Sequence, residues 1–355
     1  MKSINRRWLR NGTALVLVLL FSAACITINT GEAEKPAGNQ SVVTNPTAVN
    51  VGPADPSGQP PAAEPTTVPD PRIMPGEPQT VEGEVKDAET GGVAAQKRAI
   101  SGDSYLDNFY ERPFTQVSMD YLPDIDIQGG VISSDAQFFY FTIVLNGTNA
   151  QTNTLVADYG VELDTDTDGR GEYSVWVTAP TGNTWTTNGV RVLRDGNGDI
   201  GGKNVYESDA PYTTNGYESA VDNTGLKAAW ARVHPENAAT VQIAVHRDLV
   251  GNPLEMLWGL WADNGLKNPG LFDYNDTYTL TKAGSPYSNY PQYPVKEVFA
   301  CDNTCRQPWG FAPIYRIPNI CWSGGPVITP DPGFKLKFPW IFLFRVYIPT
   351  PVPVY

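Results

Sequence analysis

The sequence predicts an all-β protein whose folded part is an antiparallel, jelly-roll-like β-sandwich with long loops, preceded by a disordered tether. Three observations lead to this fold class. Short runs of alternating apolar and polar residues recur between turn signals, glycine and proline are abundant at 33 and 31 copies, and helical periodicity is scarce. Short strands joined by many turns are typical of sandwiches, whereas alternating strands and helices would indicate a parallel α/β sheet.

The first 24 residues have the pattern of a signal peptide, 1–24. Basic side chains precede the apolar run 14–21, which is too short to cross a bilayer comfortably, and small residues follow it. Ser-Ala-Ala-Cys, ending at Cys25, resembles the bacterial lipoprotein box, although Ser22 stands where leucine is usual. We therefore expect an exported chain held at the cell membrane by a lipid on Cys25. The alternative is ordinary cleavage near Ala24 and secretion, with Cys25 left as a free thiol.

Residues 25–97 are rich in Pro, Ala, Thr, Gly and Glu, and no hydrophobic period persists among them. Such a segment buries too little apolar surface to offset its ordering entropy, so we expect a disordered linker. The β-sandwich is predicted over residues 98–321, and an apolar, Pro-rich tail over 322–355. A chain of 355 residues could hold two domains, but all-β folds often use more than about 200 residues for one, so a single tethered head is expected.

The strands of the head follow from period-two alternation and β-prone composition, bounded by turn residues such as Asn146-Gly147. One short helical turn is expected at 246–251. The predicted strands are 135–145, 154–163, 173–178, 189–193, 240–246, 254–261 and 276–281.

An acidic stretch lies between two of these strands, where Asp164, Asp166 and Asp168 alternate with threonines and end at Gly169. This spacing matches the first half of an EF-hand loop, and carboxylate oxygens are the ligands that calcium prefers. The twelfth position holds Val175 instead of a bidentate glutamate, and the flanks are strands instead of helices. We expect a structural calcium loop that is not an EF-hand.

A second turn repeats the same spacing with Asp195, Asn197 and Asp199. These residues are a further predicted calcium site. The alternative is that Asp, Asn and Gly simply form good turns, because their side chains bond the local backbone and tolerate left-handed conformations.

Cysteine usage fits an oxidising compartment, with Cys301, Cys305 and Cys321 near the end of the head. A Cys305–Cys321 bridge would close a proline-containing loop, and Cys301–Cys321 is the alternative pairing. A zinc site fits less well, because the chain has only 2 histidines and neither is nearby in sequence.

Two tryptophans are the predicted ligand-binding residues. Trp176 lies on the strand face opposite Val175 and Val177, and Trp185 lies in a polar, turn-like segment. Exposed rings with polar neighbours stack on sugar faces, so carbohydrate is the leading ligand class and an extracellular glycan the leading partner. The competing interpretation is a structural or adhesive surface protein, with a surface protein as partner and all aromatic residues in the core.

Other function classes have less support. The formal net charge of −13 argues against nucleic acid, whose binding depends on Lys and Arg. The sequence lacks a Gly-x-Ser-x-Gly elbow, a phosphate-binding glycine loop and a His-Glu-x-x-His motif. A glycosidase would have to use the acidic pairs Asp124/Asp126 or Glu162/Asp164. We therefore predict no catalytic residues, with a glycosidase-like enzyme as a further alternative.

The signal, the Pro-rich tether and the β-rich head carrying Val161-Glu-Leu-Asp-Thr-Asp-Thr-Asp-Gly169 resemble extracellular bacterial modules of the DOMON-like and family-9 carbohydrate-binding type. The resemblance covers about residues 100–300 and is one of pattern. It implies a sandwich fold, and ligands among sugars, haem or metals.

Overall fold

The computed structural model describes residues 72–198, 200, 216–268, 271, 277–313 and 320–321 of the chain. The predicted signal peptide, the lipidated Cys25, most of the tether and the tail 322–355 lie outside the described residues.

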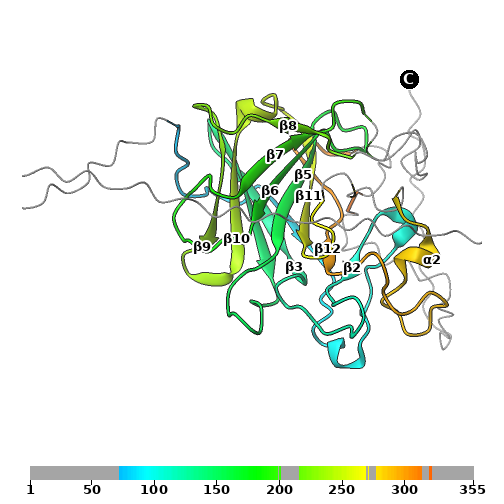
Figure 1. Ribbon diagram of the computed structural model, residues 1–355. Coiled ribbons are helices and arrows are strands. Elements are labelled where there is room, and N and C mark those ends of the chain that lie inside the picture. The colour runs from blue at the N-terminus through cyan, green and yellow to red at the C-terminus, as the bar shows by residue number, and fades with distance from the viewer. Residues whose placement is uncertain are drawn as a thin grey trace, which may run out of the picture. The chain divides into compact units, whose positions relative to one another are not determined.

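Two antiparallel sheets make up this part of the protein, which confirms the predicted β-sandwich. Figure 1 shows β5, β6, β7 and β11 side by side in one of them. The five-stranded sheet has the order β1 (Gly83–Lys86), β3 (Ile127–Ser134), β4 (Phe138–Leu145), β10 (Asn237–His246) and β9 (Ala229–His234). The eight-stranded sheet has the order β2 (Glu111–Arg112), β12 (Cys301–Asn303), β11 (Met256–Asp263), β5 (Asp158–Asp164), β6 (Tyr173–Thr178), β7 (Val190–Arg194) and β8 (Ser219–Val221), and β13 (Gln307–Trp309) also pairs with β11.

The main core lies between the two sheets. Phe139 and Phe141 of β4 belong to the same buried cluster as Tyr159 and Val161 of β5. The ring of Phe141 lies 5.9 Å from that of Trp258 on β11, measured between centroids. Alternate residues of each strand thus enter one shared core, as the period-two pattern requires.

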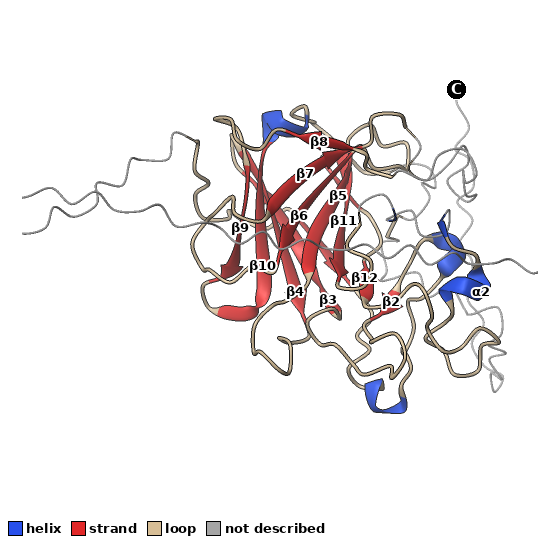
Figure 2. Ribbon diagram, in the orientation of Figure 1, coloured by secondary structure: helices blue, strands red, loops and turns tan. Residues whose placement is uncertain are grey.

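A second layer covers the outer face of the eight-stranded sheet. There, Trp176 of β6 and Trp261 of β11 pack with Tyr105 and Tyr110 from the segment that contains β2. The helical segments are short and lie outside the sheets, as Figure 2 shows. Those that lie wholly within the described residues are η1 (Ala94–Gln96), η2 (Tyr105–Asp107), η3 (Arg247–Val250) and α2 (Leu280–Ala283).

The structure corrects two boundaries predicted from the sequence. The tether was predicted to reach residue 97, but β1 pairs with β3 and buries Val85, so the folded region begins earlier. A strand was predicted at 276–281, but α2 begins at Leu280, where Thr279 caps it by accepting a hydrogen bond from the Lys282 amide. The short helical turn predicted at 246–251 is confirmed as η3.

Candidate metal centre

The acidic loop connects β5 to β6, two neighbouring strands of the eight-stranded sheet. Asp164 is the last residue of β5, and Leu163 faces Tyr173 across the strand pair. Because the strands run antiparallel, residues 165–172 must fold back over the strand end. This return brings the two ends of the acidic stretch together.

Four carboxyl groups meet in this loop. Asp164, Asp166, Asp168 and Glu172 each offer one oxygen, and these oxygens all lie within 4.8 Å of one another. Asp164 is buried, Asp166 and Asp168 are exposed, and Glu172 is half-buried. The three aspartates predicted as ligands are therefore brought together, and Glu172 joins them as a residue that the sequence analysis missed.

Hydrogen bonds within the loop fix its shape. The Gly169 amide donates to Asp164 Oδ2 at 2.8 Å, and the Asp168 amide donates to Asp166 Oδ1 at 3.1 Å. Gly169 has a φ of +98°, in the region that favours glycine. The other oxygen of Asp164, Oδ1, is buried and has no hydrogen-bond partner in the described part of the chain.

Burial and mutual repulsion both act on the carboxyls of the loop. Burial, together with the neighbouring Asp168, raises the pKa of Asp164 to about 6, although Arg306 opposes the shift. Burial likewise raises the pKa of Glu172 to about 7, and Asp164 and Asp166 add to the effect. The negative charge of the loop is therefore only partly compensated by the surrounding protein.

One arginine anchors the loop to the sheet. Arg306 forms an ion pair with Glu162 of β5 at 3.0 Å, and it donates a hydrogen bond from Nη1 to the Gly169 carbonyl. The Tyr217 hydroxyl donates to the same glutamate at 2.6 Å. The loop is thus held from its own strand and from the segment that follows β12.

In the second predicted calcium turn, backbone amides of the turn itself bond to both carboxylate oxygens of Asp195. Asp195 Oδ1 accepts hydrogen bonds from the amides of Asn197 at 3.2 Å and Gly198 at 2.7 Å, while its Oδ2 accepts from the Ile200 amide at 3.0 Å. Asp199 lies outside the described residues. This pattern agrees with the alternative that Asp195 shapes a turn, and calcium binding there stays a prediction.

Trp176 does not offer the exposed face that sugar stacking requires. Its side chain is on the predicted strand face, opposite Val175 and Val177, but it is only 1% exposed. Trp261 packs beside it at 6.5 Å between ring centroids. The structure contradicts the exposed ring expected at Trp176, because segments that strand alternation does not reveal cover this outer face.

Trp185 is half-buried, and protein groups occupy its surroundings. The Arg232 guanidinium lies 4.2 Å from the ring centroid, and the Tyr140 ring lies 6.2 Å away. The indole nitrogen donates to the Gly76 carbonyl at 3.0 Å. Trp185 therefore closes the N-terminal segment onto the five-stranded sheet, and the predicted flat binding platform is not formed.

The acidic pairs considered for a glycosidase are also in structural surroundings. Asp124, Asp126, Glu162 and Asp164 are all buried. Glu162 is committed to Arg306, and Asp126 accepts a hydrogen bond from the Tyr121 hydroxyl at 2.5 Å. Such carboxyls do not face an open substrate site.

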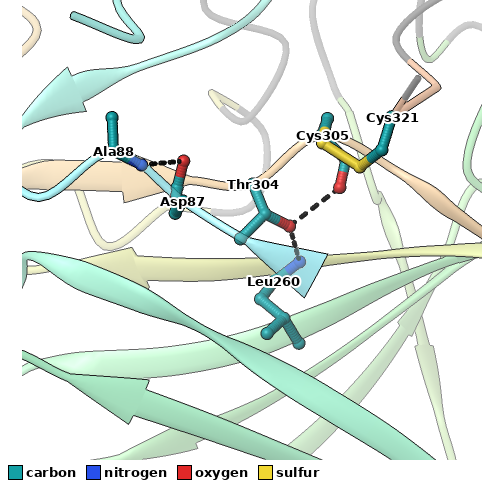
Figure 3. The surroundings of a disulfide bond; sticks show 6 residues. All are labelled: Asp87, Ala88, Leu260, Thr304, Cys305 and Cys321. Carbon is teal, nitrogen blue, oxygen red and sulfur yellow. Dashed lines mark hydrogen bonds between the residues drawn. A yellow bond between two sulfur atoms is a disulfide. The ribbon is translucent and has the colours of Figure 1, made fainter. Parts of the chain in front are cut away.

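A disulfide joins Cys305 to Cys321, with 5.1 Å between their Cα atoms, and Cys301 is a buried free thiol. Figure 3 shows Thr304 beside the disulfide. The Thr304 hydroxyl donates a hydrogen bond to the Cys305 carbonyl and accepts one from the Leu260 amide. The Thr304 hydroxyl therefore fixes the residue before Cys305 against β11, and the bridge joins Cys321 to this segment.

Replacing both disulfide cysteines, Cys305→Ser with Cys321→Ser, should lower the free energy of unfolding by about 3 kcal/mol, because the bridge closes a loop of about 15 residues in the unfolded chain. Urea unfolding followed by circular dichroism measures the change. A reductant is the control, since it should weaken the original protein and leave the double variant unaffected. Equal stability of the two proteins would contradict the prediction.

A comparison with known proteins finds no family model and no curated protein that matches this chain. The likeness to DOMON-like and family-9 carbohydrate-binding modules stays a prediction. No helix in the described residues is long and apolar enough to cross a membrane.

Proposed function

We propose that this protein is an exported, lipid-anchored β-sandwich that binds calcium in the loop between β5 and β6 and serves as a structural or adhesive module at the cell surface. The observation that carries the proposal is the convergence of four carboxyl oxygens in this loop within 4.8 Å of one another. The signal-like residues 1–24 and the lipoprotein-like sequence before Cys25 support export and anchoring.

The geometry suits calcium. Oxygen ligands lie about 2.3–2.6 Å from the ion, so two ligands of one ion are at most about 5 Å apart. The oxygens of the cluster satisfy this limit. The buried, unpartnered Oδ1 of Asp164 supplies a ligand atom that no donor among the described residues claims. A divalent cation would also neutralise the carboxyl repulsion that, after burial, raises the pKa of Glu172.

A structural or adhesive role is favoured over glycan binding. Of the two tryptophans on which glycan binding depended, Trp176 is buried under the outer layer, and Trp185 is half-buried with the Arg232 guanidinium over its ring. The calcium loop directly continues β5, a strand whose residues are all buried. An ion here would fix the end of a core strand, and surface protein contacts become the expected mode of partner recognition.

Calcium should raise the melting temperature of the protein, and chelation should lower it. At a calcium concentration 100-fold above the dissociation constant, the expected rise is about 5–10 °C. Differential scanning calorimetry of the full chain in detergent, with calcium or with a chelator, measures it. Equal melting temperatures in both conditions would remove the proposal.

Replacing the two exposed ligands, Asp166→Asn with Asp168→Asn, tests the location. Both side chains lie at the surface, so the fold should tolerate the change while one bound calcium per chain is lost in equilibrium dialysis. Asp222→Asn is the matched control, because Asp222 is also an exposed aspartate that shapes a turn with Thr224. Unchanged calcium binding in the double variant would contradict the assignment.

A further inference from the structure

A second group of carboxyls lies in the interior, away from the calcium loop. Glu111 of β2, Asp302 of β12 and Asp126, which precedes β3, each offer an oxygen within 4.8 Å of the others. Their exposed fractions are 1%, 0% and 0%. Three acidic side chains buried at one place are costly for a fold, because each loses its hydration.

The strand register forces two of these acids together. Glu111 stands directly opposite Asp302 in the antiparallel pair of β2 and β12. Like charges in directly opposed positions destabilise a sheet. Asp302 Oδ2 accepts a hydrogen bond from the Ile127 amide at 2.7 Å, which brings the neighbouring Asp126 to the same place.

Within the described residues, the groups that donate hydrogen bonds to the cluster are neutral. The Thr90 hydroxyl donates to Glu111 Oε1 at 2.6 Å. Asp126 accepts hydrogen bonds from the Tyr121 hydroxyl and from the Asn146 amide group. None of the ion pairs among the described residues includes one of the three acids. Arg112, next to Glu111 in sequence, is paired with Asp103.

Several buried carboxyl oxygens of this region have no hydrogen-bond partner in the described part of the chain. Glu111 Oε2 and Asp302 Oδ1 are buried and lack a hydrogen-bond partner within the described residues. Asp87, directly after β1, has a third such oxygen, Oδ2. Burial first, and then the neighbouring carboxyls, raise the pKa of Glu111 and that of Asp302 well above their usual range. The protein alone does not compensate these groups.

We propose that Glu111, Asp126 and Asp302 bind a second divalent cation inside the fold, that Asp87 is a further ligand, and that the ion is calcium. All the donors are carboxylate oxygens, which suit a hard cation. The ion would join β1 and β3 of one sheet to β2 and β12 of the other. The ion would thus be bound by three distant parts of the chain. These are the N-terminal segment, the long connection between β2 and β3, and the strand before the disulfide.

Metal analysis of the full chain tests the proposal. We expect two calcium ions per chain in the original protein, one in Asp302→Asn, and one in the Asp166→Asn, Asp168→Asn variant. The Asp166→Asn, Asp168→Asn double variant, called the surface-loop variant, leaves the interior acids intact. Its calcium content therefore tests the loop site of the proposed function separately from the interior site. One equivalent of a different divalent ion, lost in Asp302→Asn, would support the site and overturn the assignment of its ion as calcium.

Melting temperatures provide a second readout, with samples refolded in chelator because the site is closed. Without metal, Asp302→Asn should melt above the original protein, since one of the repelling charges is gone. With calcium the order should reverse, because only the original protein gains the ion. The same metal content in Asp302→Asn and the original protein would overturn the proposal.

If Asp302→Asn does not fold, the surface-loop variant still tests whether the interior cluster binds a metal ion. It should still contain one calcium ion and should still melt lower after refolding in chelator. No bound metal in that variant, with a melting temperature unaffected by chelator, would show that protons neutralise the cluster and would overturn the proposal.

Discussion

Replacing Arg306 by methionine is expected to lower the free energy of unfolding by about 3–5 kcal/mol. The guanidinium pairs with Glu162 at 3.0 Å, and the two side chains are only 7% and 9% exposed. Methionine fills much of the same volume but leaves a buried carboxylate without its counter-charge. The cost of an uncompensated buried charge is much larger than the net worth of the pair.

The effect should extend beyond the pair because Arg306 connects three parts of the fold. Its side chain reaches the Gly169 carbonyl in the acidic loop between β5 and β6, and its backbone carbonyl accepts a hydrogen bond from the Cys321 amide at 2.7 Å. The residue before it, Cys305, carries the disulfide. Loss of the guanidinium therefore destabilises both the acidic loop and the disulfide-linked segment that follows β12.

Urea unfolding measures this prediction, with Lys227→Met as the matched control. Lys227 pairs with Asp248 at the surface, so its replacement should cost at most about 1 kcal/mol. Adding Glu162→Gln to Arg306→Met should recover part of the loss, since the uncompensated charge is then removed. Similar losses for Arg306→Met and Lys227→Met would contradict this account.

Strand alternation was sufficient to predict the sandwich and its central strands, but not the irregular ones. β3 was missed because it contains Gly129 and Gly130, which are poor strand formers. Here the glycines are required: a β-bulge lies between Ile127 and Gly129, and a side chain on Gly129 would approach the Val85 carbonyl to 2.3 Å. Packing between distant segments, which the local pattern does not contain, selects these residues.

The carboxyl cluster of the acidic loop was partly predictable for a similar reason. Asp164, Asp166 and Asp168 are close in sequence and share a turn, so their spacing is a local signal. Glu172 joins them only because β6 returns beside β5, although its position three residues after Gly169 was a usable hint. Glu111 and Asp302 are 191 positions apart, and only the pairing of β2 with β12 brings them together.

Replacing Trp176 by alanine is expected to lower the free energy of unfolding by about 3–5 kcal/mol, as for other buried tryptophans. An exposed, sugar-stacking ring would cost far less, so the measurement separates the sequence-based hypothesis from the observed packing. Trp185→Ala is the matched control, because that half-buried ring should cost clearly less. Equal, small losses for both variants would contradict the burial of Trp176.

The packing around Trp176 allows a stricter test through Gly160. This glycine stands between Trp176 on β6 and Trp261 on β11, and a Cβ added to it would lie 2.6 Å from Cδ2 of Trp176. Gly160→Ala alone should therefore destabilise the protein by about 1–3 kcal/mol through overpacking. In the Trp176→Ala background the added methyl group enters the vacated space, so the second substitution should cost much less than it does alone. Additive losses in urea unfolding would show that the indole does not lie over Gly160, and would return Trp176 to the set of candidate ligand-binding residues.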